Sequence, residues 1–354
     1  MQKHKGRGAQ LSVNNRFSKL RHELRGDFLD HCVKEQENVL KVKTTYKEVH
    51  PKTIVNKITS PDVGMEYSMN PYQGCEHGCI YCYARNTHEY WGYGPGLDFE
   101  SRILVKRNAA RLLESQIRKK SWQASTIVMS GNTDCYQPAE KKFKITRECL
   151  EVFLKYRHPV GIITKNALVL RDLDLLKALN KHGLVAVHIS ITSLSEKTRR
   201  LLEPRTATIQ RRLNTVQTLS RHGIPVNVMM APIIPSINSH EILNMAKAVS
   251  EAGALSMGHT MVRLNGAIGH IFYDWIKKNM PDRANRVMRQ IESCHGGNLN
   301  DSRFGIRMRG EGKIANQIKD LIKLSKKKYF KDKKLPKLNT ELHANYKDDQ
   351  LKLF

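Results

Sequence analysis

Short apolar runs alternate with helical patterns through the middle of the chain. The apolar runs lie at residues 67–70, 125–130, 160–164, 184–190, 225–230 and 254–262. Between them, apolar residues recur every three to four positions, as on one face of an amphipathic helix, for example over 108–119 and 209–222. Buried strands that are separated by helices predict a parallel sheet with crossover connections. Six such units predict an α/β fold, namely a partial (β/α)6 TIM-type barrel that stays open along one side.

The two ends of the chain break this alternation and predict extensions of the core. Residues 1–60 are polar and basic, so we expect an N-terminal extension there and the core over 61–262. We expect a C-terminal cap over 263–330 that covers the mouth of the barrel. The last stretch, 331–354, is a charge run with little periodicity, which predicts a basic, disordered tail.

Three cysteines follow the first expected strand within one short stretch. In the order Cys75-x3-Cys79-x2-Cys82, three thiolates can converge on one inorganic centre, and soft sulfur selects zinc or an iron–sulfur cluster. A structural zinc site is normally closed by four protein ligands, of which His77 would be the fourth. A 4Fe-4S cluster on three cysteines would instead keep one iron free. Local zinc motifs usually come as separated ligand pairs, so the spacing favours the cluster and leaves zinc as the alternative.

This stretch resembles the signature of radical S-adenosylmethionine (radical SAM) enzymes. In that family, the free iron binds the amino and carboxylate groups of SAM, which is reduced to a 5′-deoxyadenosyl radical. Over roughly residues 60–310, the chain is similar to the group related to spore photoproduct lyase, also described as DNA repair photolyase-like. The resemblance implies a 4Fe-4S cluster and SAM as cofactors. It also implies an electron donor such as flavodoxin or ferredoxin.

The same resemblance implies roles for three residues near the cysteines. Tyr81 and Tyr83 flank the third cysteine, where the lyase has two tyrosines that are assigned to hydrogen-atom return. We expect Tyr81 to pack against SAM and Tyr83 to act in catalysis. Cys135 lies in the loop after the second core strand, where the lyase has a cysteine hydrogen donor, although the order of the neighbouring residues differs. Cys135 is therefore the second catalytic candidate.

Polar residues at the ends of later strands are candidates for binding SAM. They are Thr133, Asp134, Lys165, Ser190, Thr192 and Arg205. By resemblance, Thr133 and Asp134 would meet the methionyl amino group, and Lys165 would pair with the carboxylate. Ser190 and Thr192 alternate at a strand end, so both side chains point to one side and could hydrogen-bond the ribose, with support from the arginine.

The net charge of the chain points to a candidate binding partner. Sixty Lys and Arg residues against 33 Asp and Glu give a formal net charge of +27, which attracts polyanions. DNA or RNA is therefore the expected partner, with basic side chains such as Arg102, Arg199 and Arg212 as contacts. A solvated basic surface without function is the alternative.

The number of cysteines and the hydropathy of the chain indicate the cellular compartment of the protein. An odd number of cysteines, seven, with three in one stretch, does not suit a disulfide framework. The basic N-terminus is not followed by an apolar segment, and no run of eighteen apolar residues occurs. We expect a cytoplasmic protein without a membrane partner.

These observations predict a radical SAM enzyme that acts on nucleic acid as a repair lyase or a modifying enzyme. Two alternatives stay open. One is radical SAM modification of a peptide or small molecule, and the other is a non-enzymatic iron–sulfur protein that binds nucleic acid. The last alternative predicts binding without formation of 5′-deoxyadenosine.

Overall fold

The computed structural model describes residues 4, 6–18 and 42–346, and the core of this part is an open seven-stranded sheet. Its strand order is β10-β9-β8-β7-β6-β3-β2. The six parallel strands are β3 (Tyr67–Met69), β6 (Ile127–Met129), β7 (Val160–Thr164), β8 (Val185–Ser190), β9 (Val226–Ile233) and β10 (Ser256–Met261). The edge strand β2 (Val55–Lys57) runs antiparallel to β3. The predicted α/β fold and its six strands are confirmed, and the sheet is a partial barrel.

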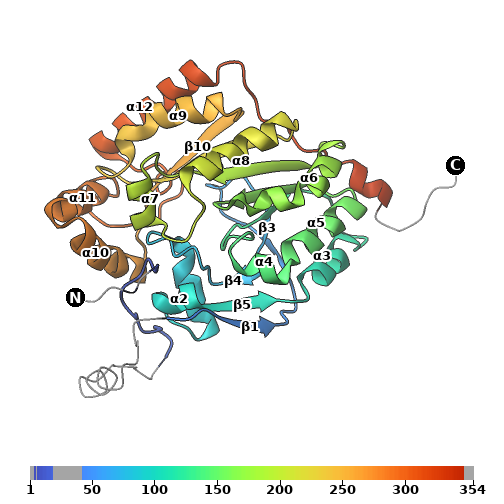
Figure 1. The fold of residues 1–354 in the computed structure, drawn as a ribbon, viewed down its shortest axis with the longest axis horizontal. Coiled ribbons are helices and arrows are strands. Elements are labelled where there is room, and N and C mark those ends of the chain that lie inside the picture. Colours follow the sequence, from blue (N-terminus) through green and yellow to red (C-terminus); the bar gives the residue numbers. More distant parts are fainter. Residues whose placement is uncertain (1–3, 5, 19–41, 347–354) are drawn as a thin grey trace.

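Helices cover the outer face of this sheet (Figure 1). The longer ones are α3 (Ala109–Ile117), α5 (Ile145–Lys155), α6 (Leu173–Asn180), α8 (Ile209–Arg221) and α9 (Ile242–Glu251). Short helices lie in the loops after strands and are α4 (Ala139–Phe143), η2 (Ala167–Asp172), α7 (Glu196–Leu202) and η3 (Ser239–Glu241). No helix in the described part of the chain is long and apolar enough to cross a membrane.

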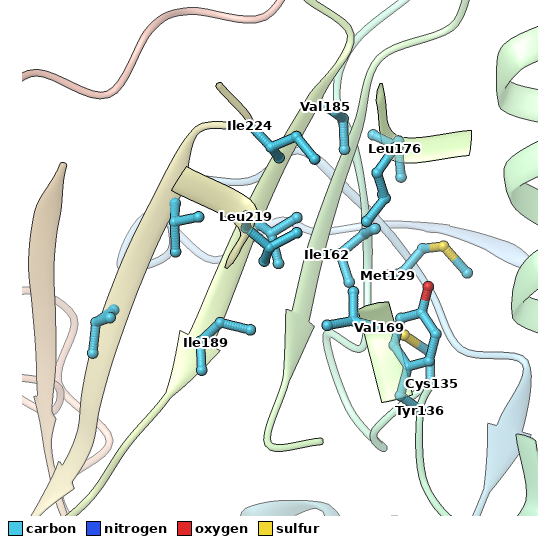
Figure 2. Close-up of a cluster of buried hydrophobic side chains, with 14 of the residues drawn as sticks. Met129, Cys135, Tyr136, Ile162, Val169, Leu176, Val185, Ile189, Leu219 and Ile224 are labelled. Carbon is cyan, nitrogen blue, oxygen red and sulfur yellow. The ribbon is translucent and has the colours of Figure 1, made fainter. Parts of the chain in front are cut away.

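Alternation along the strands places apolar side chains between the sheet and these helices. Figure 2 shows Ile162 of β7 and Val185 and Ile189 of β8 beside Leu176 of α6 and Leu219 of α8. Successive strand residues point to opposite faces, so these positions meet the helices and the residues between them face the barrel interior. Each buried side chain of this size contributes roughly 1.5–3 kcal/mol.

A second, three-stranded sheet was not predicted. It consists of β1 (Thr45–Val49), β5 (Arg102–Lys106) and β4 (Tyr72–Gln73), with α2 (Leu97–Ser101) directly before β5. Strand β1 is mostly exposed and polar, and it is held by parallel pairing with β5 rather than by an apolar pattern of its own. Part of the expected N-terminal extension therefore contributes strands β1 and β2 to the two sheets, and residues 1–3, 5 and 19–41 of it lie outside the described residues.

The expected C-terminal cap divides into two parts. Helices α10 (Ala267–Asn279) and α11 (Pro281–Ser293) pack on each other, and α10 also contacts η1 (Tyr83–Trp91), which follows the cysteines. Helix α12 (Gly312–Tyr329) lies instead beside α9 in the outer helical layer (Figure 1). Side chains of α10 and α11 share a hydrophobic cluster with Cys79 and Tyr81, whereas α12 belongs to the outer layer.

The expected disordered tail follows a defined path over residues 331–346. It ends in η4 (Leu342–Tyr346), and the ring of His343 is buried. Its nitrogens lie 2.8 Å from the Tyr156 carbonyl oxygen and 3.0 Å from that of Ile117. The prediction of disorder is wrong for this part because basic composition does not reveal one buried side chain with distant partners. The remainder of the tail lies outside the described residues.

Candidate active site

The cysteine loop begins at the carboxyl end of β3, the end at which parallel barrels place their chemistry. Cys75 and Cys79 are each 7% exposed, Cys82 is partly exposed, and all three are free thiols. The Gly78 N–H donates to the Cys75 carbonyl at 3.3 Å, and the Cys82 N–H donates to the Cys79 carbonyl at 3.3 Å. The loop therefore holds three sulfur atoms on one short, turned segment.

The burial of these thiols and the nearby charge of Lys165 suit a metal centre. Burial raises the pKa of all three, that of Cys79 to about 12, while the nearby Lys165 ammonium acts in the opposite direction on Cys79. A buried thiol of this kind stays protonated until a bound metal takes the place of the proton. The three cysteines can serve as ligands without being reactive thiolates beforehand.

A single zinc ion fits this arrangement poorly. Among the described residues, no three His, Cys, Asp or Glu side chains are placed to hold one metal ion. A zinc ion would need sulfur atoms about 3.8 Å apart, because Zn–S bonds are about 2.3 Å long. The Nδ1 atom of His77 lies 3.3 Å from Asp134 Oδ2, and its Nε2 atom lies 3.3 Å from Asn166 Nδ2. Both ring nitrogens thus have protein partners, so His77 is not free to serve as a fourth zinc ligand.

Asp134 connects three segments around the cysteine loop. Its Oδ1 accepts a hydrogen bond from Thr164 Oγ1 at 2.8 Å, and its Oδ2 accepts one from the Lys165 N–H at 2.8 Å. Burial alone would raise the pKa of Asp134, but the His77 ring and these donors outweigh it and hold the pKa at about 2. Thr133 is also engaged, because its hydroxyl donates to a β4 carbonyl at 2.5 Å. Both residues thus hold loops in place, and their expected contact with the methionyl amino group stays a prediction.

A buried carboxylate that sequence analysis did not select, Glu203, is at the centre of a polar network. Arg212 Nη2 donates to its Oε2 at 2.6 Å, Thr192 Oγ1 donates to its Oε1 at 2.7 Å, and the Tyr81 hydroxyl also donates to Oε1. Burial would raise the pKa of Glu203, but Arg212 and Lys165 outweigh it and lower the pKa to about 2. Tyr81 and Thr192 are therefore held by protein, next to the strand end that carries the ribose candidates.

Lys165 lies between the cysteine loop and this network. Burial would lower its pKa, but the proximity of Cys79, Glu203 and Asp134 raises it, so the side chain carries a positive charge. Within the described part of the chain, its ammonium group forms no salt bridge. Lys165 is thus a cation at the carboxyl end of β7 that is available to an anionic ligand. Ser190, at the end of the neighbouring strand β8, is buried.

The side chain of Arg205 is engaged with protein groups. Its Nη2 lies 3.4 Å from Glu76 Oε2, and its Nη1 donates to Thr44 Oγ1 at 3.4 Å. These partners belong to the outer side of the cysteine loop. The guanidinium is therefore held by protein groups, and the expected contact of Arg205 with SAM stays a prediction.

Two arginines considered for nucleic-acid contact are buried instead. Arg199 is 5% exposed and Arg212 is 1% exposed. They form ion pairs with Glu196 and Glu203, respectively. Both expectations are wrong, because these guanidinium groups stabilise the fold and do not reach a phosphate backbone.

Cys135 lies in the hydrophobic core. Figure 2 shows it with Met129, Tyr136, Ile162 and Val169, and it is 0% exposed. Burial raises its pKa well above the ordinary value. This position corrects the expected role of Cys135 as a hydrogen donor, since its side chain belongs to the apolar layer between sheet and helices.

The mouth of the barrel presents exposed rings beside arginines. Tyr83 is 55% exposed, and its hydroxyl donates to the Gly131 carbonyl at the start of the loop after β6. Phe304 is 60% exposed, with the guanidinium of Arg307 4.4 Å from its ring centroid. Arg263 interacts electrostatically with both Tyr83 and Arg307. Arg307 is itself paired with Asp62, so among these arginines only Arg263 lacks a salt bridge to a described residue.

An N-terminal segment, residues 6–16, crosses the outer side of the cysteine loop, and we call it the strap. Glycines allow close backbone contact along it. A Cβ atom would meet a carbonyl oxygen at 1.9 Å for Gly8 against Gly78, at 2.2 Å for Gly94 against Val13, and at 2.3 Å for Gly96 against Leu11. No larger residue fits at these positions without movement of the backbone.

Buried Glu100 joins the strap to the cysteines. Its Oε2 accepts a hydrogen bond from the Gly8 N–H at 2.9 Å, and its Oε1 accepts one from the Ala9 N–H at 2.8 Å. Glu100 also pairs with Arg85, whose Nε donates to the Cys79 carbonyl at 3.0 Å. The strap was not predicted, because its signal is a set of glycines in distant segments.

Comparison with known proteins agrees with this geometry. A family model described as the radical SAM superfamily matches residues 69–249. An uncharacterised protein of Mycobacterium tuberculosis is 32% identical over 245 residues, which cover 68% of this chain and 72% of that protein. A radical SAM Nα-GlyT isomerase of Pseudomonas phage M6 is 24% identical over 195 residues, which cover 54% of this chain and 38% of that protein.

Solved structures agree in fold. A variant of spore photoproduct lyase with bound AdoMet and dinucleoside spore photoproduct superposes with a TM-score of 0.60. The match covers 90% of this chain and 86% of the lyase, at 15% sequence identity. At this identity, the likeness establishes the shared fold and leaves the reaction open.

Proposed function

The chain belongs to the radical SAM superfamily, whose enzymes use a 4Fe-4S cluster and SAM, and on this premise we propose that Cys75, Cys79 and Cys82 hold the cluster. When bound, the cluster supplies the open iron and the electron with which SAM is cleaved to a 5′-deoxyadenosyl radical. The observation that carries the proposal is the set of three free thiols on one loop beside the Lys165 cation.

The chain's own residues bind and orient SAM in this proposal. Lys165 pairs with the carboxylate, because it is a cation without a salt bridge to any described residue. Ser190 hydrogen-bonds the ribose from the end of β8. Tyr81 and Thr192 shape the same wall through Glu203, and Thr133 and Asp134 fix the loop opposite.

We further propose nucleic acid as the substrate, in a repair or modification reaction. The net charge of +27 and the exposed rings of Tyr83 and Phe304 support this, since proteins bind single strands by stacking bases on aromatic side chains beside cations. Arg263 is partly buried and donates to Asn300 and Met308, but it forms no salt bridge with a described residue, so a phosphate would neutralise its charge. The fold shared with a lyase that binds a dinucleoside photoproduct is in line with this class. Tyr83 is our candidate for hydrogen-atom transfer.

The proposed partner for reduction is an electron donor such as flavodoxin or ferredoxin. The proposed compartment is the cytoplasm, because free ligand thiols require reducing conditions.

The test of the activity is formation of 5′-deoxyadenosine from SAM with dithionite under anaerobic conditions. We expect product from the reconstituted wild-type protein and none above background from the Cys79→Ala variant. A wild-type protein that contains zinc and no iron, or that yields no product, contradicts the proposal.

The test of the substrate class is the salt dependence of oligonucleotide binding. Affinity should fall by roughly 0.7–0.9 log units per phosphate contact for each log unit of salt. Weak binding that does not respond to salt removes nucleic acid and leaves the radical SAM assignment in place.

A further inference from the structure

The proposed function, on which this inference rests, requires a reductant to reach the cysteine loop from outside the barrel. Such a reductant cannot approach every part of the loop equally well. On one side, the strap packs backbone to backbone against the loop, with Gly8 directly over the Gly78 carbonyl. A protein that docks there meets the strap first.

A basic groove lies beside the part of the loop that the strap covers, since Arg205 of the groove and Arg7 of the strap both donate to Thr44. It has a volume of about 510 Å³ and lies between α4, η2 and α8. The cations that line it are Lys141, Arg205 and Arg211, and no acidic residue lines it. Lys141 and Arg211 are exposed, and neither forms a salt bridge with another described residue. Their charges are therefore available to an acidic surface.

The floor of this groove contacts the cysteine loop directly. The Arg205 N–H donates to the His77 carbonyl at 3.3 Å. Asn166, which also lines the groove, lies 3.3 Å from His77 Nε2 through its Nδ2 atom. His77 is two residues from Cys75 and two from Cys79. A redox group held in the groove would be separated from the cluster ligands by a single layer of residues.

We propose that this groove is the docking site of an acidic one-electron carrier protein of the flavodoxin or ferredoxin type. In each reduction, the carrier loses one electron and the cluster gains one, and no bond forms or breaks. Complementary charge would steer the acidic carrier into the groove and raise its association rate.

The position of the groove distinguishes such a carrier from nucleic acid. A nucleic-acid substrate has to present its reacting atom at the mouth beside Tyr83, where exposed rings can stack on bases. The residues that line the groove include no aromatic side chain, and two of them, Asn166 and Arg205, contact His77. An electron carrier needs only charge complementarity and a short distance to the cluster, and the groove offers both.

The experiment compares two reductants in one assay. The groove variant Lys141→Glu/Arg211→Glu and the wild-type holoenzyme are supplied either with dithionite or with flavodoxin reduced by its reductase, and 5′-deoxyadenosine is measured. Dithionite is small and does not require docking. We expect the flavodoxin-driven rate of the groove variant to fall about tenfold or more, with an unchanged dithionite-driven rate.

The matched control is Arg283→Glu/Arg286→Glu on α11, which makes the same change in charge at a separate basic hollow of about 440 Å³. It should keep the wild-type rate with both reductants. A flavodoxin-driven rate that is unchanged in the groove variant, or that falls equally in the control, overturns the proposal. So does a groove variant that loses only oligonucleotide affinity. Absence of product with dithionite in the wild-type protein would instead refute the proposed function itself.

Discussion

The cysteine loop and the barrel mouth around Tyr83 are adjacent in sequence but differ in how their polar groups are satisfied. Around the loop, the carboxylates of Glu100, Asp134 and Glu203 are all bonded to protein donors. At the mouth, Tyr83 is exposed and the guanidinium of Arg263 has no salt bridge to a described residue. The first region is therefore built to hold its ligands in a fixed geometry, and the second is left open for a partner.

The largest expected effect comes from breaking the network of the first region. In Arg212→Gln, the Glu203 carboxylate loses its main buried partner, and an unpaired buried charge costs about 3–5 kcal/mol. Urea unfolding of the metal-free protein measures this loss. The matched control is Arg200→Gln, whose exposed pair with Glu196 is worth about 0–1 kcal/mol. Equal effects at both sites would show that the network does not stabilise the fold.

The strap gives the next largest effect. Gly8→Ala places a methyl group against the Gly78 carbonyl, and overpacking of this kind costs typically about 1–3 kcal/mol. Because the strap covers the cysteine loop, Cys79 of the metal-free protein should also react faster with an alkylating reagent, as measured by mass spectrometry. The control Gly64→Ala adds its methyl group in open space. Unchanged alkylation in Gly8→Ala would show that the strap does not protect the loop.

Acid should weaken the first region in a defined direction. The folded state lowers the pKa of Glu203 to about 2, below the ordinary value near 4.5 for an unfolded chain. The contribution of Glu203 is therefore complete above pH of about 4.5 and is lost as the pH falls toward about 2. Unfolding measured across this range should show a flatter pH dependence for Glu203→Gln than for the wild-type protein, and identical slopes would contradict the assignment.

A substitution at the barrel mouth should have the smallest effect on stability and a clear effect on oligonucleotide binding. Arg263→Gln should lower the salt dependence of oligonucleotide affinity by one phosphate contact, roughly 0.7–0.9 log units, with little change in unfolding. Arg289→Gln on the exposed face of α11 is the control and should keep the wild-type slope. A wild-type slope in Arg263→Gln would remove this arginine from the binding surface.

Features that depend on residues close together in the sequence were predictable, and features that depend on distant residues were not. Six strands were found because the alternation of apolar runs and helical patterns is local. The cysteine motif was found for the same reason, because Cys75, Cys79 and Cys82 lie within eight residues of one another in the sequence. Glu203 and the strap were missed, because their roles depend on Arg212 and Gly78, which are close only in space.

Side-chain direction was the second limit. Cys135 and Arg205 lie in the loops where they were expected, but the first faces the core and the second faces Glu76. A loop position does not specify which way a side chain points. Lys165 was easier to place, since it directly follows a buried strand and shares its carboxyl end with the cysteine loop.

The most direct test of the central claim is EPR spectroscopy of the reduced, reconstituted protein before and after addition of SAM. Three cysteine ligands leave one iron of the cluster open, so the account predicts an iron–sulfur signal that changes when SAM binds. The signal should be absent from the Cys75→Ala/Cys79→Ala/Cys82→Ala variant. An iron–sulfur signal that SAM does not alter, or that survives in the triple variant, would contradict the assignment of the cysteine loop.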